Sequence, residues 1–476
     1  MVRCAALGAA LAAVTLVSAH GHGAHRHHNR HPIPSPVVAR APGDPTITPA
    51  PGAMALNKIS PNEPSPATST LPVTQAGAKP SGIPNAPALP DISNWDGVSK
   101  YPTWDKVPST TSPQVIEWID EVRNSGVVIP DIKPHIVTGS GDCQAAANVP
   151  RVNNDTECWW TCGHCTRNTD VVDCKSAKNW GSTFDDGPSD YTNELLLYLE
   201  QAKIKSTFFV VGSRVAQRPK TVQTQYLLGH NVAIHTWSHT ALTSQSTEQI
   251  IAEFGWSKKV IKDVLGVTPL YIRPPYGDID DRVRAIAKAM NLTVVIWSVT
   301  GTQQAPISFD SFDFDVAAGE KTAAEGVAQF QSLLGTASTY ANGFTVLEHD
   351  LFWPQVKLAV GYYLPGALQA GFKITSVNEC MSVSNADAYS ETSSVKTLPG
   401  GSGQGKDMTG TGQTAPPNAA LGGSDGSNTD PNVKAGEDPE TTGDQGGAAV
   451  LLDIGSAKLV LAVLLASLVA FVPGAL

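Results

Sequence analysis

Residues 182–211 read STFDDGPSDYTNELLLYLEQAKIKSTFFVV, and this stretch decides the fold. It holds two short apolar, strand-like segments, STFDD and STFFVV, with an amphipathic helix-like segment over 190–202 between them. The same alternation continues along the chain, with further strand-like segments that begin at His230, Leu270, Leu292, Gly343 and Phe372. Apolar strands that alternate with helices predict an α/β fold of parallel strands covered by helices. About seven such units favour a closed or nearly closed (β/α) barrel over an open sheet.

The first polar motifs of this core fall at predicted strand ends. Asp185 and Asp186 end the first strand. Because side chains alternate along a strand, one carboxylate can hold a metal while its neighbour stays free. Asp-Asp-Gly-Pro is also good turn chemistry, so this motif alone leaves both interpretations open. His235 and His239 follow the third strand, where a helical turn would bring both imidazoles onto one face. An Asp with a His pair is a common ligand set for a catalytic divalent metal.

Two later strands also end in polar motifs. In RPPYG, residues 273–277, two prolines stiffen the backbone and leave the amide of Tyr276 available. The motif VLEHD ends another strand with His349. In barrels of this kind the carboxyl ends of the strands surround one pocket. The four motifs together therefore predict a single catalytic site.

The two ends of the chain indicate where the protein works. Residues 1–19 have a basic Arg3, an apolar stretch and small residues at the end, which is typical of a cleaved secretory signal. Residues 459–476 are apolar and uncharged, and the small Gly446 lies upstream as a candidate attachment residue for a glycosylphosphatidylinositol anchor. A membrane-spanning helix is the alternative, but no basic segment follows the apolar one. We expect a secreted protein that is lipid-anchored at the plasma membrane and cell wall.

Composition divides the 476 residues further. We expect a signal peptide over 1–19, a disordered His/Pro-rich segment over 20–93, a Cys-containing extension over 94–172, the patterned core over 173–390, a disordered Gly/Ser/Thr-rich linker over 391–447 and a removed anchor signal over 448–476. Six histidines in 20–31 are interpreted as a solvated tail rather than a metal site. The net charge of −10 argues against a nucleic-acid partner. We expect a monomer with one core.

Six cysteines remain once Cys4 leaves with the signal peptide. The run CWWTCGHC, which contains Cys162 and Cys165, resembles a zinc knuckle. An even number of cysteines in an exported protein favours three disulfides instead. Cys174 and Cys380 flank the patterned core, so a bridge between them would tie its beginning to its end. The pairing stays open at this stage.

The motifs TFDDGP, HTWSH, RPPYG and LEH resemble, in order and spacing, those of the NodB-type polysaccharide deacetylases of carbohydrate esterase family four. Within that family the chain is most similar to fungal chitin deacetylases. The resemblance covers about residues 173–377 and implies a distorted (β/α) barrel that binds one divalent metal, zinc or cobalt. It makes 173–390 a deacetylase domain.

The resemblance also implies a role for each matching residue. The metal ligands would be Asp186, His235 and His239, with Asp185 as the general base and His349 as the general acid. Arg273 would orient Asp185. The backbone N–H of Tyr276 would contact the oxyanion, and Leu347 would line the acetyl pocket. The reaction would release acetate and leave an amino sugar.

One position departs from the family pattern. After the strand that ends at Trp297, the family usually places an aspartate that pairs with the motif arginine, whereas this chain has Thr300 and its next acid is Asp310. We expect Arg273 to lie closer to Asp185 or to contact substrate, which would lower the pKa of the Asp185 carboxyl. A turn-capping role for Thr300 without catalytic meaning is the alternative.

The expected location at a cell surface indicates the substrate. Sequons at Asn154 and Asn291 predict N-glycosylation and, with secretion and an anchor, a eukaryotic surface. Chitin or chitin oligomers in a fungal wall are then the expected partner, with acetylxylan and peptidoglycan as alternatives within the same chemistry. A wall-binding protein with little turnover is the competing class. The aromatic candidates for stacking on sugar rings are Trp159, Trp160, Trp237 and Trp353, although buried positions are the usual place for Trp.

Overall fold

The computed structural model describes residues 45–71, 74–80, 82–83, 85–137, 142–302 and 305–395. The predicted signal peptide, most of the linker, Gly446 and the anchor signal lie outside these residues. All described residues belong to one compact unit, Met1–Ala419. Among them, no helix combines the length and the apolar character that crossing a membrane requires.

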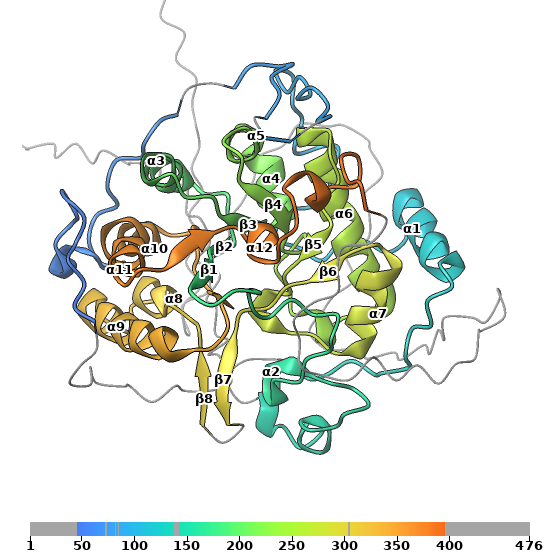
Figure 1. Cartoon of the computed structure of the whole chain (residues 1–476). Helices are drawn as coiled ribbons and strands as arrows, with labels where there is room; N and C mark the ends of the chain where they lie inside the picture. The colour runs from blue at the N-terminus through green and yellow to red at the C-terminus, as the bar shows by residue number, and fades with distance from the viewer. Residues whose placement is uncertain are drawn as a thin grey trace, which may run out of the picture. The chain divides into compact units, whose positions relative to one another are not determined.

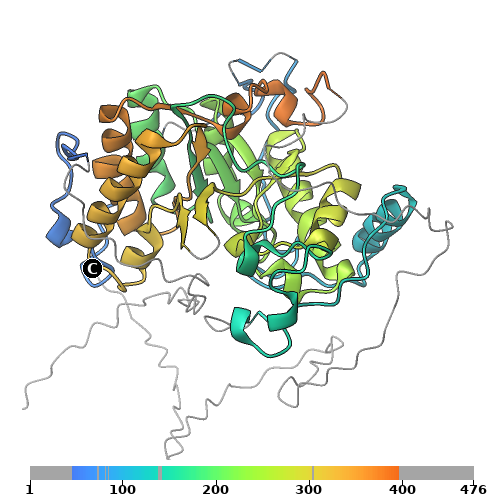
Figure 2. The same ribbon diagram turned by 60° about the horizontal axis from the view of Figure 1, so that its bottom comes forward.

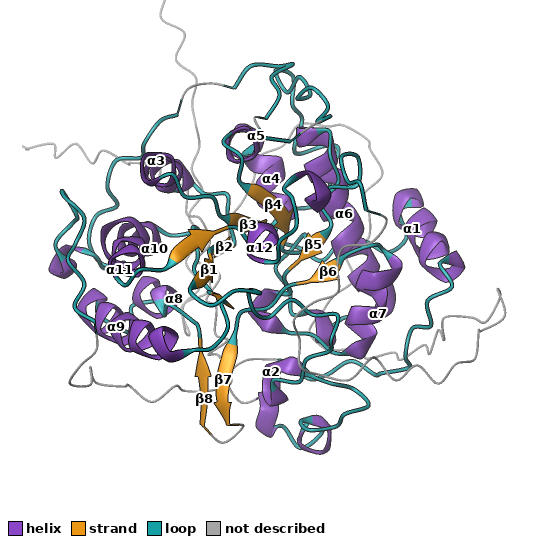
Figure 3. Ribbon diagram, in the orientation of Figure 1, coloured by secondary structure: helices purple, strands orange, loops and turns teal. Residues whose placement is uncertain are grey.

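Helices surround short central strands (Figure 3). The strands are β1 (Asn179–Gly181), β2 (Thr183–Asp185), β3 (Thr207–Val210), β4 (Asn231–Ile234), β5 (Tyr271–Ile272), β6 (Thr293–Val294), β7 (Val299–Thr302), β8 (Ala305–Ser308), β9 (Phe344–Thr345) and β10 (Lys373–Thr375). The helices are α1 (Pro113–Asn124), α2 (Trp160–Gly163), α3 (Thr192–Ala202), α4 (Gly212–Gln217), α5 (Pro219–Leu227), α6 (Thr247–Leu265), α7 (Asp281–Ala289), α8 (Asp313–Ala317), α9 (Ala323–Thr339), α10 (Trp353–Leu358), α11 (Leu364–Gln369) and α12 (Val377–Cys380). Short 3-10 segments are η1 (Leu56–Lys58), η2 (Asp142–Gln144), η3 (Val149–Arg151), η4 (Leu242–Ser244), η5 (Pro275–Gly277) and η7 (Ala386–Ala388), and η6 (Ala359–Tyr363) is a π-helical turn.

The strands form two parallel sheets and one hairpin (Figure 1). One sheet has the order β2-β3-β4-β5-β6, and the other has the order β10-β1-β9. β7 and β8 pair antiparallel. All seven segments that the sequence predicts as strands are strands, and every pair among them is parallel. The prediction of an α/β fold with parallel strands is therefore confirmed.

A single barrel of about seven strands is not confirmed. Ser182 separates β2 from β1, a strand that the sequence analysis did not predict, and the two strands belong to different sheets. A backbone hydrogen bond still links β2 to the chain that follows β9 in the other sheet: Asp185 N donates to Glu348 O at 2.9 Å. Ser298, after β6, donates to Thr345 O at 3.1 Å. Strands of two to four residues are too short to sustain one continuous ladder, which is the physical reason for the division.

The core is formed by apolar strand residues and the inward faces of the helices. Phe184, Phe208, Val232 and Ile272 on four neighbouring strands are fully buried. α6 is delimited by local signals: a capping box starts it at Ser246, and Gly266 ends it in the left-handed conformation at φ 79°. On another side, α9 and α11 pack against each other (gold and orange in Figure 2). Buried apolar layers on both sides of the sheets hold the strand ends in fixed positions.

The segment before the core is more ordered than its composition predicts. From residue 45 onward it runs along the domain in irregular backbone and buries Ile47, Ile59 and Leu89. Ala50 N donates to Gly361 O at 2.9 Å. The expectation of a disordered segment over 20–93 is therefore wrong for its described part. The apolar residues of this segment have no periodicity and therefore predict neither helix nor strand. Ile47, Ile59 and Leu89 are nevertheless buried in the structure.

Three disulfides account for the six cysteines of the described residues. Cys174 pairs with Cys380, so the expected bridge between the beginning and the end of the core is confirmed. Cys143 pairs with Cys162, and Cys158 pairs with Cys165, within the Cys-containing extension. The zinc-knuckle alternative is excluded, because Cys162 and Cys165 are each bonded in a disulfide.

Asp278 joins the extension to the core. Its buried carboxylate accepts hydrogen bonds from Trp159 Nε1 at 3.0 Å and Thr161 Oγ1 at 2.6 Å, and from the backbone N–H of Thr243 at 2.8 Å. These donors come from the disulfide-linked extension and from the loop that follows β4. One carboxylate therefore fixes two segments beside the RPPYG motif.

We expect Asp278→Ala to lower the free energy of unfolding by about 3 kcal/mol, because it leaves several buried donors without an acceptor. Denaturant unfolding with the disulfides intact measures this. Asp131→Ala is the matched control, since the Asp131 side chain is 85% exposed. Equal stability of the two variants would contradict the role of Asp278.

Candidate active site

The structure brings Asp186, His235 and His239 together at the carboxyl ends of β2 and β4. Their candidate ligand atoms all lie within 4.8 Å of one another. His239 Nε2 is 2.9 Å from Asp186 Oδ1, and His235 Nε2 is 3.4 Å from the same oxygen. All three side chains are at least nine-tenths buried. One carboxylate and two imidazoles in this arrangement fit a divalent metal that keeps further coordination positions open.

The loop between the two histidines is not the helical turn that their spacing predicts. Residues 235–240 form no helix, and Thr236 and His239 have φ values of 63° and 61°. His239 N donates to Thr236 Oγ1 at 3.0 Å. His235 Nδ1 lies 2.7 Å from Arg273 O, which leaves its Nε2 facing Asp186. A tight loop with left-handed residues, rather than the expected helical turn, therefore brings the two imidazoles together.

Glu253 on α6 stabilises the loop between His235 and His239 by hydrogen bonds. Its fully buried carboxylate accepts from the backbone N–H groups of Trp237 at 2.7 Å and Ser238 at 2.9 Å, and from Ser238 Oγ at 2.5 Å. Burial raises the pKa of Glu253 to about 7, although the hydrogen bonds oppose that shift. The sequence analysis missed this residue, because it lies 14 positions after His239 on a helix with no motif of its own.

Asp185 and Asp186 have different surroundings, as expected, although Asp186 lies just beyond β2 with φ 75° rather than within the strand. Asp185 Oδ1 accepts from Arg273 Nη1 at 3.0 Å. Burial raises the pKa of Asp185, and the Arg273 guanidinium opposes that rise. Burial also acts to raise the pKa of Asp186, but His239 and His235 hold it well below its usual range. The pair divides into one carboxylate for the metal site and one beside it.

Arg273 lies against Asp185, as expected from the absence of an acid at position 300. It also donates to Thr183 Oγ1 at 2.5 Å and stacks over the Phe209 ring at 4.4 Å. Arg273 acts to lower the pKa of the Asp185 carboxyl, as expected, yet that pKa is raised overall. Complete burial of the Asp185 carboxyl outweighs the single guanidinium beside it.

His349 has a carboxylate partner that the sequence analysis did not identify. Asp313 Oδ1 lies 2.7 Å from His349 Nδ1, and Asp313 Oδ2 accepts from the His349 backbone N–H at 2.7 Å. Burial acts to lower the pKa of His349, but Asp313, with smaller contributions from Asp186 and Asp185, more than compensates and raises it to about 10. The imidazole is therefore held in its charged form at neutral pH.

Asp313 follows the β7–β8 hairpin, and this position explains why it was missed. Thr300 pairs with Ile307 inside the hairpin. The chain then returns beside β9, where Ser311 N donates to Leu347 O at 3.0 Å, and α8 begins at Asp313. Asp313 thus lies 13 residues after Thr300, and its carboxylate pairs with His349 rather than with Arg273. The run of acids in SFDSFDFD, residues 308–315, was the available signal.

Tyr276 and Leu347 also belong to this end of the sheet. Tyr276 has φ 61°, and its ring meets the His239 ring edge to face at 4.7 Å. The following residue must be glycine: a Cβ on Gly277 would lie 2.2 Å from the Trp160 ring. Leu347 is buried on the strand that carries His349. The disulfide-linked extension therefore supports the RPPYG loop from behind.

Other predicted residues do not join the site. Trp159 and Trp237 are fully buried, and Trp160 and Trp353 are nearly so, which leaves none of them a face for stacking on sugar. Asn291 is exposed and Asn154 is half-buried. Thr156 Oγ1 donates to Asn154 Oδ1 at 2.7 Å.

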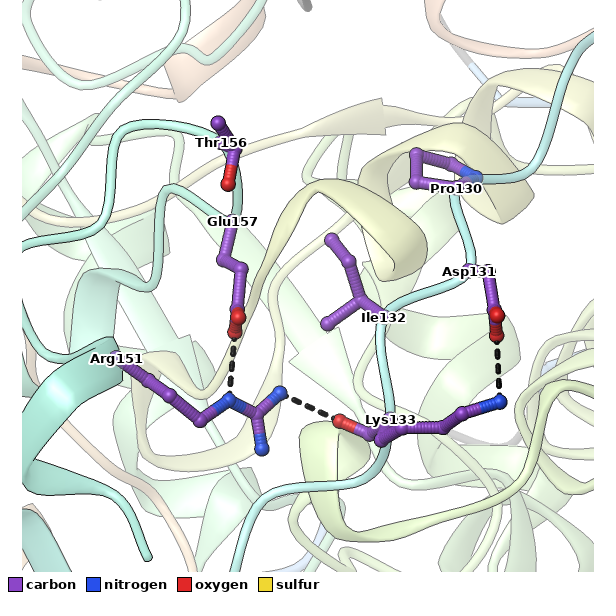
Figure 4. A pocket seen from close by; sticks show the side chains of 7 residues that line it. All are labelled: Pro130, Asp131, Ile132, Lys133, Arg151, Thr156 and Glu157. Atoms are coloured by element: carbon purple, nitrogen blue, oxygen red, sulfur yellow. Dashed lines mark hydrogen bonds and ion pairs between the residues drawn. The ribbon is translucent and has the colours of Figure 1, made fainter.

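A cavity of about 500 Å³ lies in the Cys-containing extension (Figure 4). It is lined by Pro130, Asp131, Ile132, Lys133, Arg151, Thr156 and Glu157. Its charged side chains are paired, with 2.8 Å between Arg151 Nε and Glu157 Oε2. The candidate catalytic residues do not line it, so it is distinct from the metal site.

We expect Glu253→Gln to weaken zinc binding about tenfold, because an amide presents one acceptor oxygen where the carboxylate presents two. Competition with a chelator measures the affinity. Glu121→Gln, at an exposed position on α1, serves as the control. Unchanged affinity in a folded Glu253→Gln protein would show that the loop holds its shape without this carboxylate.

Comparisons with known proteins agree with this geometry. The family model described as polysaccharide deacetylase matches residues 173–295. Chitin deacetylase 1 of Cryptococcus neoformans var. grubii is 44% identical over 346 residues, which cover 72% of this chain and 71% of that protein. The chitin deacetylase of Amylomyces rouxii is 38% identical over 241 residues, which cover 48% of this chain and 54% of that protein.

A solved structure, that of the chitin deacetylase from the fungal pathogen Colletotrichum lindemuthianum, is 22% identical with a TM-score of 0.41. The match covers 47% of this chain and 96% of that one. The family is decided by the sequence of the Cryptococcus relative, which this chain matches over about seven-tenths of its length. This chain belongs to the polysaccharide deacetylase family.

Proposed function

We propose that this protein is a metal-dependent chitin deacetylase, which hydrolyses the N-acetyl groups of N-acetylglucosamine residues to give chitosan and acetate. The observation that carries the proposal is the constellation at the strand ends: Asp185 lies beside the Asp186, His235 and His239 cluster, and His349 lies on the neighbouring strand. The names of the Cryptococcus and Amylomyces relatives support chitin as the substrate. Acetylxylan and peptidoglycan remain the alternative substrates.

Asp186, His235 and His239 would hold one divalent ion, zinc or cobalt. Bound there, the ion would supply Lewis-acid polarisation of the amide carbonyl and a lowered pKa of water. The remaining chemistry belongs to the side chains around the cluster.

Asp185 acts as the general base. Its carboxylate takes a proton from the attacking water as the oxygen–carbon bond forms. Burial raises its pKa, which makes it a stronger base than an exposed aspartate, while Arg273 at 3.0 Å fixes its orientation. A second contact from Arg273, to Thr183, limits the movement of the guanidinium.

His349 acts as the general acid. An amine is a poor leaving group as its anion, so the nitrogen must receive a proton as the carbon–nitrogen bond breaks. Asp313 keeps the imidazole charged and fixes Nδ1, which directs Nε2 to the substrate. The backbone N–H of Tyr276 would stabilise the oxyanion, and Leu347 would contact the acetyl methyl group.

The cellular setting is part of the proposal. The three disulfides support export to an oxidising compartment. The signal peptide over 1–19, glycans at Asn154 and Asn291 and an anchor at Gly446 would make a glycosylated, lipid-anchored protein of the plasma membrane and cell wall. The boundaries at 94, 173, 391 and 448 and the monomeric state remain proposals. So does a distorted seven-stranded barrel, which the hydrogen bond from Ser298 to Thr345 supports.

Substituting Asp185 and Asp186 one at a time separates their roles. We expect Asp186→Ala to lose both bound zinc and acetate release from chitin oligomers. Asp185→Asn should retain zinc and lose at least about 100-fold in kcat, since an amide cannot accept the proton of water. Metal analysis and an acetate assay measure both. Equal zinc loss in the two variants would reject the division of roles, and an inactive, metal-loaded wild type would favour a wall-binding protein.

The pH profile tests the acid. His349 must be protonated to act, so activity falls as pH rises through its pKa. We expect Asp313→Asn to move this alkaline limb of kcat/KM to lower pH by roughly 1 to 3 units, because the carboxylate no longer favours the imidazolium. Thr300→Asp is the matched control and should leave the limb unchanged. A shift in Thr300→Asp, or no shift in Asp313→Asn, would contradict the assignment.

A further inference from the structure

Two aromatic side chains stand out among the exposed large apolar residues of the described chain. Trp104 and Phe352 are each 38% exposed. Both are held in place, since Trp104 Nε1 donates to Gly97 O at 3.1 Å and Phe352 N donates to Gln355 Oε1 at 2.7 Å. Exposed aromatic rings on fixed backbone are suited to contact with a ligand.

Trp104 lies near the carboxyl ends of the strands in the sheet that carries the metal ligands. Its neighbour Asp105 accepts from Ser213 Oγ at 2.9 Å, just beyond the end of β3. Its other neighbour, Thr103, offers its carbonyl to Trp237 Nε1 at 3.1 Å, and Trp237 lies between His235 and His239. Trp104 is thus anchored on both sides to the carboxyl ends of β3 and β4.

Arg214 connects the same segment to the metal cluster. Its Nη1 donates to the carbonyl of Asp186 at 2.7 Å, and its Nε lies 4.0 Å from Asp105 Oδ1. One buried guanidinium therefore spans the gap between the residue next to Trp104 and a candidate metal ligand.

Phe352 lies on the other side of the aspartates. It follows His349 by three residues, and the strand that carries His349 pairs with Asp185 on the edge of β2 opposite β3. The lateral order at the carboxyl ends is consequently Trp104 beside β4 and β3, then Asp185 at the end of β2 with Asp186 after it, then His349 and Phe352. The segments that carry the two exposed aromatic residues therefore lie on opposite sides of the catalytic residues.

We propose that Trp104 and Phe352 are the sugar-stacking residues at the two ends of a groove that binds an extended N-acetylglucosamine oligomer across the strand ends. This inference rests on the proposed function and adds the residues that determine its preference for chain length. Sugar rings present apolar C–H faces that pack on aromatic rings, whereas their polar edges face outward. An oligomer long enough to reach both rings gains contacts that a two-unit substrate cannot make.

The test measures acetate release by the zinc-loaded protein on two-unit and six-unit N-acetylglucosamine oligomers. We expect Trp104→Ala and Phe352→Ala each to raise KM for the six-unit oligomer roughly three- to tenfold. Their kcat, and both constants for the two-unit substrate, should change less than about twofold. Trp104→Phe should restore most of the affinity. Leu368→Ala, which removes a 43% exposed side chain from α11, is the matched control.

Unchanged KM for the six-unit oligomer in both alanine variants would overturn the groove. If the wild type releases no acetate at all, the proposed function fails, and calorimetric binding of the six-unit oligomer then decides this inference separately. Weaker binding by Trp104→Ala than by wild type would support the groove. Equal binding, or no binding by wild type, would reject it.

Discussion

Two adjacent carboxylates buried at the end of one short strand are the constraint on which the rest of the structure depends. A buried carboxylate is unfavourable unless charge or hydrogen bonds compensate it. Asp186 is compensated by two imidazoles, and Asp185 is compensated by one guanidinium. Each partner must in turn be held in place, because an unpaired charge at this depth would destabilise the fold. The backbone turns at Asp186, whose φ is 75°, directly after β2 ends at Asp185, and the two carboxylates therefore meet different partners.

The supporting residues form a second layer drawn from distant parts of the chain. Glu253 shapes the loop between the histidines, and Arg214 holds the carbonyl of Asp186. Asp278 ties the RPPYG loop to the disulfide-linked extension, whose Trp160 packs against Gly277. The extension is thus not a separate appendage, since it forms the wall behind Tyr276. The disulfides of the extension stabilise this wall, and in this way they contribute to the active site without lining it.

Sequence reasoning identified the metal cluster because its signal is local. Strand periodicity located the ends of β2 and β4, and the parallel arrangement placed them at one edge of a sheet. It did not identify Asp313, because this acid follows the β7–β8 hairpin and lies 36 residues before His349 in the chain. It favoured burial for the four tryptophans that it considered for sugar stacking, and they are buried, but it did not consider Trp104. Exposure is a property of the packed surface, so Trp237 is buried while Trp104, in a segment without periodicity, stays exposed.

The sequence by itself determined the order of strands and helices, the residues that meet at the metal cluster and the chemistry available there. These follow from periodicity and from residue type, which act over a few neighbouring positions. Only the tertiary structure decided the pairing of His349 with Asp313, the pairing of the four cysteines in the extension, the burial of Ile47, Ile59 and Leu89 and the net direction of the pKa shift at Asp185. Each of these depends on contacts or burial between residues far apart in the chain, and a linear pattern carries no record of the distances between them.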